Sequence, residues 1–179
     1  MIKNAANVAK AVAIVLQHEG GYCVDDGGPT NFGWTLPALA EIGITMTADE
    51  LQAQTPEWAA ALYTEWYWNG FGDVEDQTIA TKLLDIAVNS EEPAHVAHGR
   101  AVMMAQQALN AIGAKVTIDG VGGPKTCAAI NNCTPALLLT AIISVQARFY
   151  RFLAAQDPVK YGPSLTGWLK RAAWPGAVV

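Results

Sequence analysis

One amphipathic helix with an abrupt end constrains the start of this chain more than any other feature. Four apolar side chains recur at the spacing that places residues on one face of an α-helix: Val8, Val12, Val15 and Leu16. Glu19 falls on the same face and is followed by Gly20-Gly21, and glycines at this place commonly end a helix. The pattern predicts a helix that ends near residue 19 with a carboxylate on its apolar side.

The rest of the chain has the pattern of successive helices after one short non-helical segment. Residues 22–35 are rich in Asp, Gly, Pro, Thr and Asn, which predicts a tight turn or a small hairpin. Thr47 with Glu50 forms a capping box, while Thr55-Pro56 and Thr134-Pro135 place a cap residue before a proline. Helical patterns cover residues 57–68, 77–89, 95–111, 135–155 and 165–173. We therefore predict a mainly α fold with a small β-hairpin or loop patch near the N-terminus.

Composition indicates a folded protein and argues against two kinds of partner. Hydrophobic residues make up 51% of the chain and charged residues only 15%, as in globular domains. The formal net charge of -5 argues against nucleic acid, since phosphate binding needs a clustered basic surface. No stretch approaches the roughly 20 apolar residues that span a bilayer, so we expect no stable membrane insertion. Residues 1–16 lack a small-residue cleavage site, which predicts synthesis in the cytoplasm.

Neither a disulfide framework nor a metal site is expected. Three cysteines are too few for a disulfide framework, and their number is odd, although Cys127 and Cys133 could pair locally. His95 and His98 share one face of a helix, but no further metal ligands stand near them. We expect no metal and no cofactor.

Glu19 and the acidic residues after it stand in contrasting settings. Cleaving a glycosidic bond needs a protonated carboxylic acid beside the leaving oxygen and usually a second carboxylate. An apolar helix face favours the protonated form of Glu19, whereas the polar turn keeps Asp25 and Asp26 ionised. This contrast suits a division of acid and base roles. The same residues also occur as a surface glutamate and a common turn, so a purely structural role stays open.

A series of short motifs extends this segment along nearly the whole chain. It runs through Glu19-Gly20-Gly21-Tyr22, Asp25, Gly27-Gly28, Thr30, Asn31, Gly33, Tyr67-Trp68, residues 84–90, Asp119-Gly120, Gly123-Pro124, Thr126, Arg148, Tyr150, Gly167-Trp168 and Arg171. In this order the motifs resemble the glycoside hydrolase family 108 muramidases. Those are lysozyme-like enzymes of phage endolysins and bacterial prophage regions.

The resemblance implies a lysozyme-like fold and cleavage of the β-1,4 bond between N-acetylmuramic acid and N-acetylglucosamine. It implies that Glu19 is the catalytic acid, that Asp25 or Asp26 is the second carboxylate and that Thr30 helps to hold the attacking water. The loop before Gly27 is shorter than in typical members. Asp25 and Asp26 therefore compete for one role.

Four further residues are candidates for binding the sugar chain: Tyr22, Tyr67, Trp68 and Asn89. Aromatic rings stack on sugar faces and pack in cores equally well, so core packing stays open for the rings. Asn89 shares a helix face with Asp85 and could line the cleft. For Asp85 we favour a structural hydrogen-bonding role.

The resemblance also implies a division of the chain. Residues 1–92 would form the catalytic lysozyme-like part, and residues 93–179 a helical part that resembles a peptidoglycan-binding region, packed into the same globule. We expect a monomer that acts on peptidoglycan glycan strands, stored in the cytoplasm as an endolysin and released by holin-type export. Two alternatives remain: a lytic transglycosylase that uses Glu19 alone, and a non-catalytic wall-binding protein on the same fold.

Overall fold

A cap residue and a glycine set the two ends of the first helix, α1 (Val8–Glu19). The Asn7 side chain accepts a hydrogen bond from the backbone N–H of Lys10, which satisfies one of the free donors at the helix start. Gly20 ends the helix with a φ of 71°, a conformation that favours glycine. The sequence predicted this helix and its end. The computed structural model describes residues 6–25, 27–68, 70–90 and 97–176.

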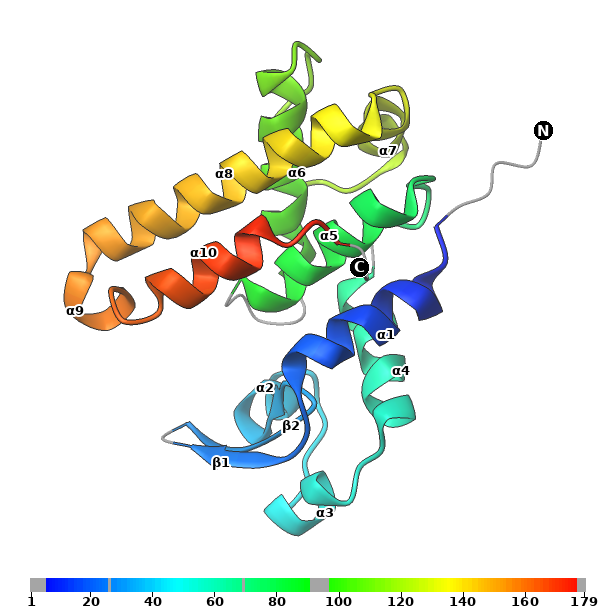
Figure 1. The fold of residues 1–179 in the computed structure, drawn as a ribbon. Helices are drawn as coiled ribbons and strands as arrows, with labels where there is room; N and C mark the ends of the chain where they lie inside the picture. Colours follow the sequence, from blue (N-terminus) through cyan, green and yellow to red (C-terminus); the bar gives the residue numbers. More distant parts are fainter. Residues whose placement is uncertain (1–5, 26, 69, 91–96, 177–179) are drawn as a thin grey trace.

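A small antiparallel sheet follows α1, as the turn-rich segment predicts. Its strands are β1 (Cys23–Asp25), β2 (Gly28–Asn31) and β3 (Trp34–Thr35), in the order β1-β2-β3. Asp25 pairs with Gly28, so only two residues connect the first two strands. Asn31 pairs with Trp34 in the second hairpin. Figure 1 shows the β1–β2 hairpin extending away from the end of α1.

Helices make up most of the described residues after the sheet. They are α2 (Leu36–Glu41), α3 (Ala48–Gln52), α4 (Pro56–Tyr67), α5 (Gln77–Asn89), α6 (Ala97–Ala111), α7 (Pro124–Asn131), α8 (Pro135–Gln156), α9 (Pro158–Tyr161) and α10 (Leu165–Ala173). The predicted mainly α fold with a β patch near the N-terminus is confirmed. The bounds of α4, α5, α6, α8 and α10 lie within two residues of the predicted ranges, because cap residues and prolines mark several helix starts. No ranges were predicted for α2, α7 and α9.

Side-chain caps form at two of the three predicted sites. Thr47 and Glu50 make the reciprocal hydrogen bonds of a capping box. The Thr55 hydroxyl accepts a hydrogen bond from the backbone of Trp58 at the start of α4. Thr134 precedes the proline that begins α8 but makes no cap hydrogen bond. At this third site the proline alone marks the start of the helix.

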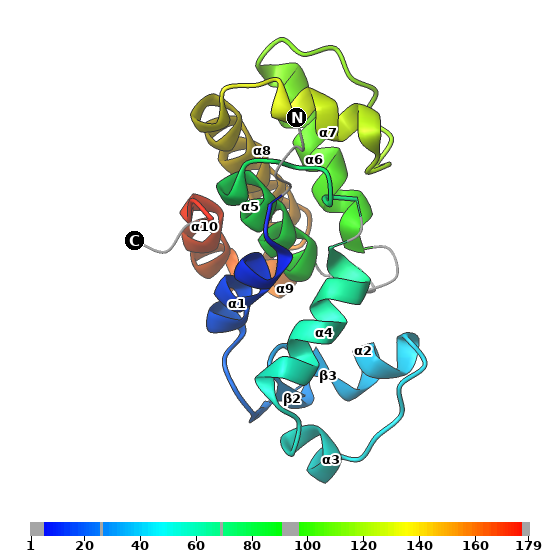
Figure 2. The same cartoon turned by 90° about the vertical axis from the view of Figure 1, so that its right-hand side faces the viewer.

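Helix α5 is the centre of the fold. Every residue from Ile79 to Ala87 is buried, including Lys82 and Asp85. It packs against α1, α6 and α8, while α8 also packs against α10. Figures 1 and 2 show α5 between α1 and the pair α6 and α8, with the sheet, α2 and α3 at the far end of the molecule. A helix buried all round must pair any charge that it carries.

Helix α8 is more apolar over its length than we expected of any segment. It has 22 residues, and an 18-residue window within it has a mean hydropathy of 1.3, enough by length and composition to cross a membrane. The expectation counted unbroken apolar stretches, and Thr140 and Ser144 interrupt this one. In the structure α8 packs on α6 and α10 through a face that includes Leu138, Ile142 and Tyr150.

Two glycines allow close contact between the segments before and after residue 93. A Cβ placed on Gly122 would lie 2.7 Å from the Cα of Gly70 and 3.0 Å from its carbonyl oxygen. The thiol of Cys127 donates a hydrogen bond to the same carbonyl at 3.4 Å. All three cysteines are free. The division into a catalytic part and a wall-binding part stays a prediction.

We expect Gly122→Ala to lower the free energy of unfolding by about 1–3 kcal/mol. The new methyl group would clash with the backbone of Gly70, which can give way only if the neighbouring residues move with it. Urea unfolding monitored by circular dichroism measures the change. Gly72→Ala is the matched control, since nothing lies within 4 Å of its Cβ position. Equal stability of the two variants would show that the close contact is absent in solution.

Candidate active site

Glu19 ends α1 with its side chain only 15% exposed. Its Oε1 accepts a hydrogen bond of 2.5 Å from Nη2 of Arg171, which belongs to α10 and lies 152 positions later in the chain. The sequence predicted a carboxylate on the apolar side of the helix, and the structure places it there. Its partner therefore comes from the C-terminal part of the sequence.

The turn between β2 and β3 covers the other side of Glu19. A Cβ on Gly33 would lie 2.9 Å from Oε2 of Glu19 and would also clash with the Tyr63 hydroxyl. Gly33 has a φ of 80°, so both its conformation and its surroundings require glycine. The Tyr63 hydroxyl donates a hydrogen bond of 2.8 Å to the Phe32 carbonyl, which ties this turn to α4.

Three aromatic rings pack together beneath this turn. The ring of Trp34 lies 5.4 Å from Tyr63 and 5.7 Å from Tyr67, in tilted and edge contacts. Burial, and then the charge of Glu19, raises the pKa of Tyr63 well above its usual range. The same two causes, with Glu41, raise the pKa of Tyr67 to about 12. Both phenols therefore stay neutral beside Glu19 at any physiological pH.

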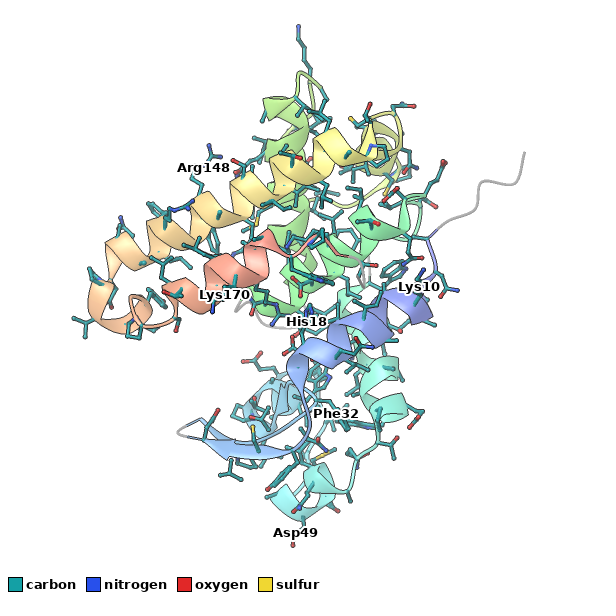
Figure 3. The ribbon with its side chains drawn as sticks, viewed as in Figure 1. Lys10, His18, Phe32, Asp49, Arg148 and Lys170 are labelled. Carbon is teal, nitrogen blue, oxygen red and sulfur yellow. The ribbon has the colours of Figure 1, made fainter. Side chains whose placement is uncertain are left out.

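Asp85 of α5 is the second carboxylate that Arg171 contacts. Its side chain is fully buried, and its Oδ1 accepts a hydrogen bond of 2.9 Å from Nε of Arg171. Nδ1 of His18 lies 3.4 Å from the same oxygen, and the His18 ring makes an edge contact with Trp174 at 4.3 Å. Figure 3 shows His18 extending from α1 toward α10. A structural role for Asp85 was the favoured prediction, and these bonds agree with it.

Lys82 completes a buried group of charges. Its Nζ lies 3.9 Å from Oδ2 of Asp85 and donates hydrogen bonds to the carbonyls of Arg171 and Ala172, at 3.1 and 3.0 Å. Burial lowers the pKa of Lys82 to about 8, although Asp85 opposes that shift. Burial also lowers the pKa of Arg171, but Asp85 and Glu19 outweigh it and hold that pKa above its ordinary value. Lys82 thus fixes the end of α10 from which Arg171 extends.

The hairpin carries the other predicted catalytic residues. Asp25 is exposed at the turn, and its Oδ1 accepts a hydrogen bond of 2.8 Å from the backbone N–H of Gly27. Asp26 lies outside the described residues. Thr30 is half-buried and pairs with Cys23 across the hairpin. Figure 1 shows the strands β1 and β2 extending away from the end of α1.

The four predicted sugar-binding residues differ in exposure. Tyr22 is 36% exposed, three positions after Glu19, whereas Tyr67 is buried in the aromatic group. Trp68 is half-buried and lines a small pocket with Gly70 and Gly122. The Asn89 amide donates a hydrogen bond of 2.7 Å to the hydroxyl of Tyr150, whose ring stacks on Trp168. Tyr22 is the most accessible of the four.

Sequence reasoning missed the residues that surround Glu19. Arg171, Gly33 and Tyr63 all contact or adjoin its carboxylate, yet none was predicted as a site residue. A single arginine 152 positions away carries no signal of pairing. Gly33 and Arg171 both stood in the motif series, and a glycine after an irregular turn indicates a place where backbone approaches another group closely.

Comparisons with known proteins identify two regions of the chain. Residues 12–90 match the family model of glycosyl hydrolase 108, and residues 100–173 match that of a predicted peptidoglycan domain. The chain thus contains a glycosyl hydrolase 108 domain. The solved structure of Brucella abortus SagA is similar, with 27% sequence identity, a TM-score of 0.64 and 96% of each chain covered. No curated protein matches the chain.

With this domain the chain is a glycoside hydrolase, and peptidoglycan is its substrate. The two matched regions meet at the site, because Glu19 lies in the first and Arg171 in the second. Across the described residues, no cluster of three His, Cys, Asp or Glu side chains could hold a metal ion. His95, considered above as a ligand, lies outside those residues.

The buried Lys82 gives a pH-dependent stability that can be measured. Its folded pKa of about 8 lies below its ordinary value of 10.5, so the unfolded chain binds more protons between these values. The contribution of Lys82 to the free energy of unfolding therefore rises as the pH increases from 8 to 10.5. Urea unfolding of wild type and Lys82→Met should show a difference that grows in favour of wild type across that window.

The buried tyrosines also make stability depend on pH, but they are the same in wild type and in Lys82→Met. Their contribution therefore cancels in the difference between the two free energies of unfolding. Lys10→Met is the matched control, because Lys10 is exposed on α1. Its difference from wild type should stay constant with pH. A constant difference for Lys82→Met as well would contradict the depressed pKa.

Proposed function

We propose that this protein is a muramidase in which Glu19 protonates the oxygen of the β-1,4 bond between N-acetylmuramic acid and N-acetylglucosamine. The observation that carries the proposal is the placement of Glu19. Its carboxylate is mostly buried yet partly open to solvent, with Arg171 on one oxygen and the Gly33 turn beside the other. A general acid needs this combination of restricted motion and access to one substrate atom.

Arg171 has a chemical role in this mechanism. When Glu19 gives its proton to the glycosidic oxygen, the carboxyl group becomes negative while the bond to the sugar C1 breaks. The guanidinium lies 2.5 Å from that carboxyl oxygen and stabilises the carboxylate, both as it forms and in the resting protein, so Glu19 must take up a proton before each turnover. Asp85 and Lys82 hold the guanidinium in place, so little reorganisation is needed during the reaction.

The fate of the sugar C1 depends on a nucleophile. In the hydrolase, water adds its oxygen to C1 and passes a proton to a carboxylate, for which Asp25 or Asp26 is the proposed base and Thr30 the proposed water ligand. This route needs the hairpin to approach the substrate. Tyr22, Tyr67, Trp68 and Asn89 are the proposed residues that line or support the sugar subsites, with Tyr22 the most exposed.

One observation favours a second candidate, the lytic transglycosylase. The Asp25 carboxylate stands at an exposed two-residue turn and already binds the Gly27 N–H. A transglycosylase needs no second carboxylate, because the C6 hydroxyl of the muramic acid attacks C1 and returns its proton to Glu19. The product is then a 1,6-anhydro sugar instead of a reducing end.

We propose that the protein acts as a monomer and without nucleic acid. Glu19, Arg171 and Asp85 all belong to one chain, and Arg171 donates hydrogen bonds to the other two. The net charge of -5 opposes binding to a phosphate backbone. The glycan strand of peptidoglycan is the proposed macromolecular partner.

Glu19→Gln should lower the rate of peptidoglycan cleavage by at least about 100-fold, because glutamine keeps the size of the side chain but cannot donate the proton. Release of soluble fragments from purified peptidoglycan measures the rate. Glu65→Gln, an exposed glutamate on α4, is the matched control and should keep full activity.

Mass spectrometry of the fragments separates the two chemistries in the same experiment. Reducing ends identify the hydrolase, and anhydro ends identify the transglycosylase. Equal rates for wild type and Glu19→Gln, with both proteins folded by circular dichroism, would overturn the assignment of Glu19 under either chemistry.

A further inference from the structure

All three charged residues between positions 101 and 147 line one pocket. They are Lys115, Asp119 and Lys125. The pocket has a volume of about 380 Å³ and lies between the loop after α6 and the start of α7. Figure 1 shows that loop and α7 at the opposite end of the molecule from the β-hairpin. Charge is thus concentrated at one place on a segment that is otherwise uncharged.

A buried glutamine shapes the wall of this pocket. Gln106 is 1% exposed, and its side-chain oxygen accepts hydrogen bonds from the backbone N–H groups of Asp119 and Gly120, each at 3.0 Å. Its amide nitrogen donates to Oδ1 of Asp119 at 2.7 Å and to the hydroxyl of Thr126 at 3.3 Å. One side chain therefore fixes the loop and the helix on both sides of the pocket.

The charges in the pocket are of both signs. Hydrogen bonds from the Val121 backbone and from Gln106 lower the pKa of Asp119, so it stays ionised at neutral pH. Lys115 and Lys125 are exposed cations, and the start of α7 adds the positive end of a helix. Asp119 would repel a ligand that carries only negative charge. A ligand with carboxylates and one ammonium group would satisfy all three side chains.

The lining also distinguishes a peptide from a sugar. Its seven residues are Gln106, Lys115, Val116, Thr117, Asp119, Lys125 and Thr126, and none is aromatic. Sugar rings are commonly bound on aromatic faces, whereas carboxylates and ammonium groups are bound by opposite charges and hydroxyls. The volume suits a fragment of a few amino acids.

We propose that this pocket binds the stem peptide of peptidoglycan, with peptide carboxylates on Lys115 and Lys125 and an ammonium group on Asp119. The proposal rests on peptidoglycan as the substrate and adds a second site, separate from Glu19. Binding there would hold the wall polymer by its peptides while the glycan strand occupies the cleavage site.

Isothermal titration of the full-length Glu19→Gln protein with a synthetic stem tetrapeptide, L-Ala-γ-D-Glu-meso-diaminopimelate-D-Ala, tests the proposal without turnover. We expect saturable binding that weakens about tenfold in a protein that also carries Lys115→Gln and Lys125→Gln, since each exposed pair contributes modestly. Lys10→Gln is the matched control on α1 and should not change the affinity. Amidation of the peptide carboxylates should weaken binding to a similar extent.

Absence of saturable binding, or equal affinity in the double lysine variant, would overturn the proposal. Both lysines are exposed, so their replacement should leave the thermal unfolding temperature unchanged, and circular dichroism checks this. The titration needs no cleavage. A failure of the Glu19 assignment would therefore leave this binding intact, and a failure of the pocket would leave the catalytic result intact.

Discussion

The contact of one guanidinium with two carboxylates organises the centre of this protein. Arg171 bonds to Glu19 at the end of α1 and to Asp85 inside α5. A fully buried aspartate is stable only when its charge is paired, and arginine offers donors in a fixed fork that can serve two acceptors. The Lys82 ammonium group holds the backbone of α10 by donating hydrogen bonds to two of its carbonyls. The bonds of Arg171 therefore hold α10 against α5 and also orient Glu19 at the end of α1.

This arrangement joins the two regions that the family models match. The region matched as glycosyl hydrolase supplies Glu19, Gly33 and Asp85, and the region matched as a peptidoglycan domain supplies Arg171. Catalysis by Glu19 would therefore depend on residues from both. The charged pocket is lined by the loop after α6 and the start of α7, which lie far from the end of α1 (Figure 1), so one region would both complete the acid and hold the wall peptides.

Local features of the sequence predicted the helices and the candidate acid. Val12 and Val15 marked the buried face of α1, and Gly20 marked its end, because these signals depend only on neighbouring residues. The pairing of Glu19 with Arg171 could not be predicted in this way, since it depends on how distant helices pack. The place of Asp25 depended on the length and direction of a hairpin, which a composition rich in turn residues does not specify.

The most direct test of this account is a double-mutant cycle on kcat/KM for peptidoglycan, with Glu19→Gln, Arg171→Gln and the two combined. If Arg171 acts through Glu19, Arg171→Gln alone lowers kcat/KM by about 10- to 100-fold but adds less than about twofold to the loss caused by Glu19→Gln. Thermal unfolding confirms that each variant is folded, and Arg171→Lys serves if Arg171→Gln is not. Losses that multiply in the double variant would contradict the account, because Arg171 would then act independently of Glu19.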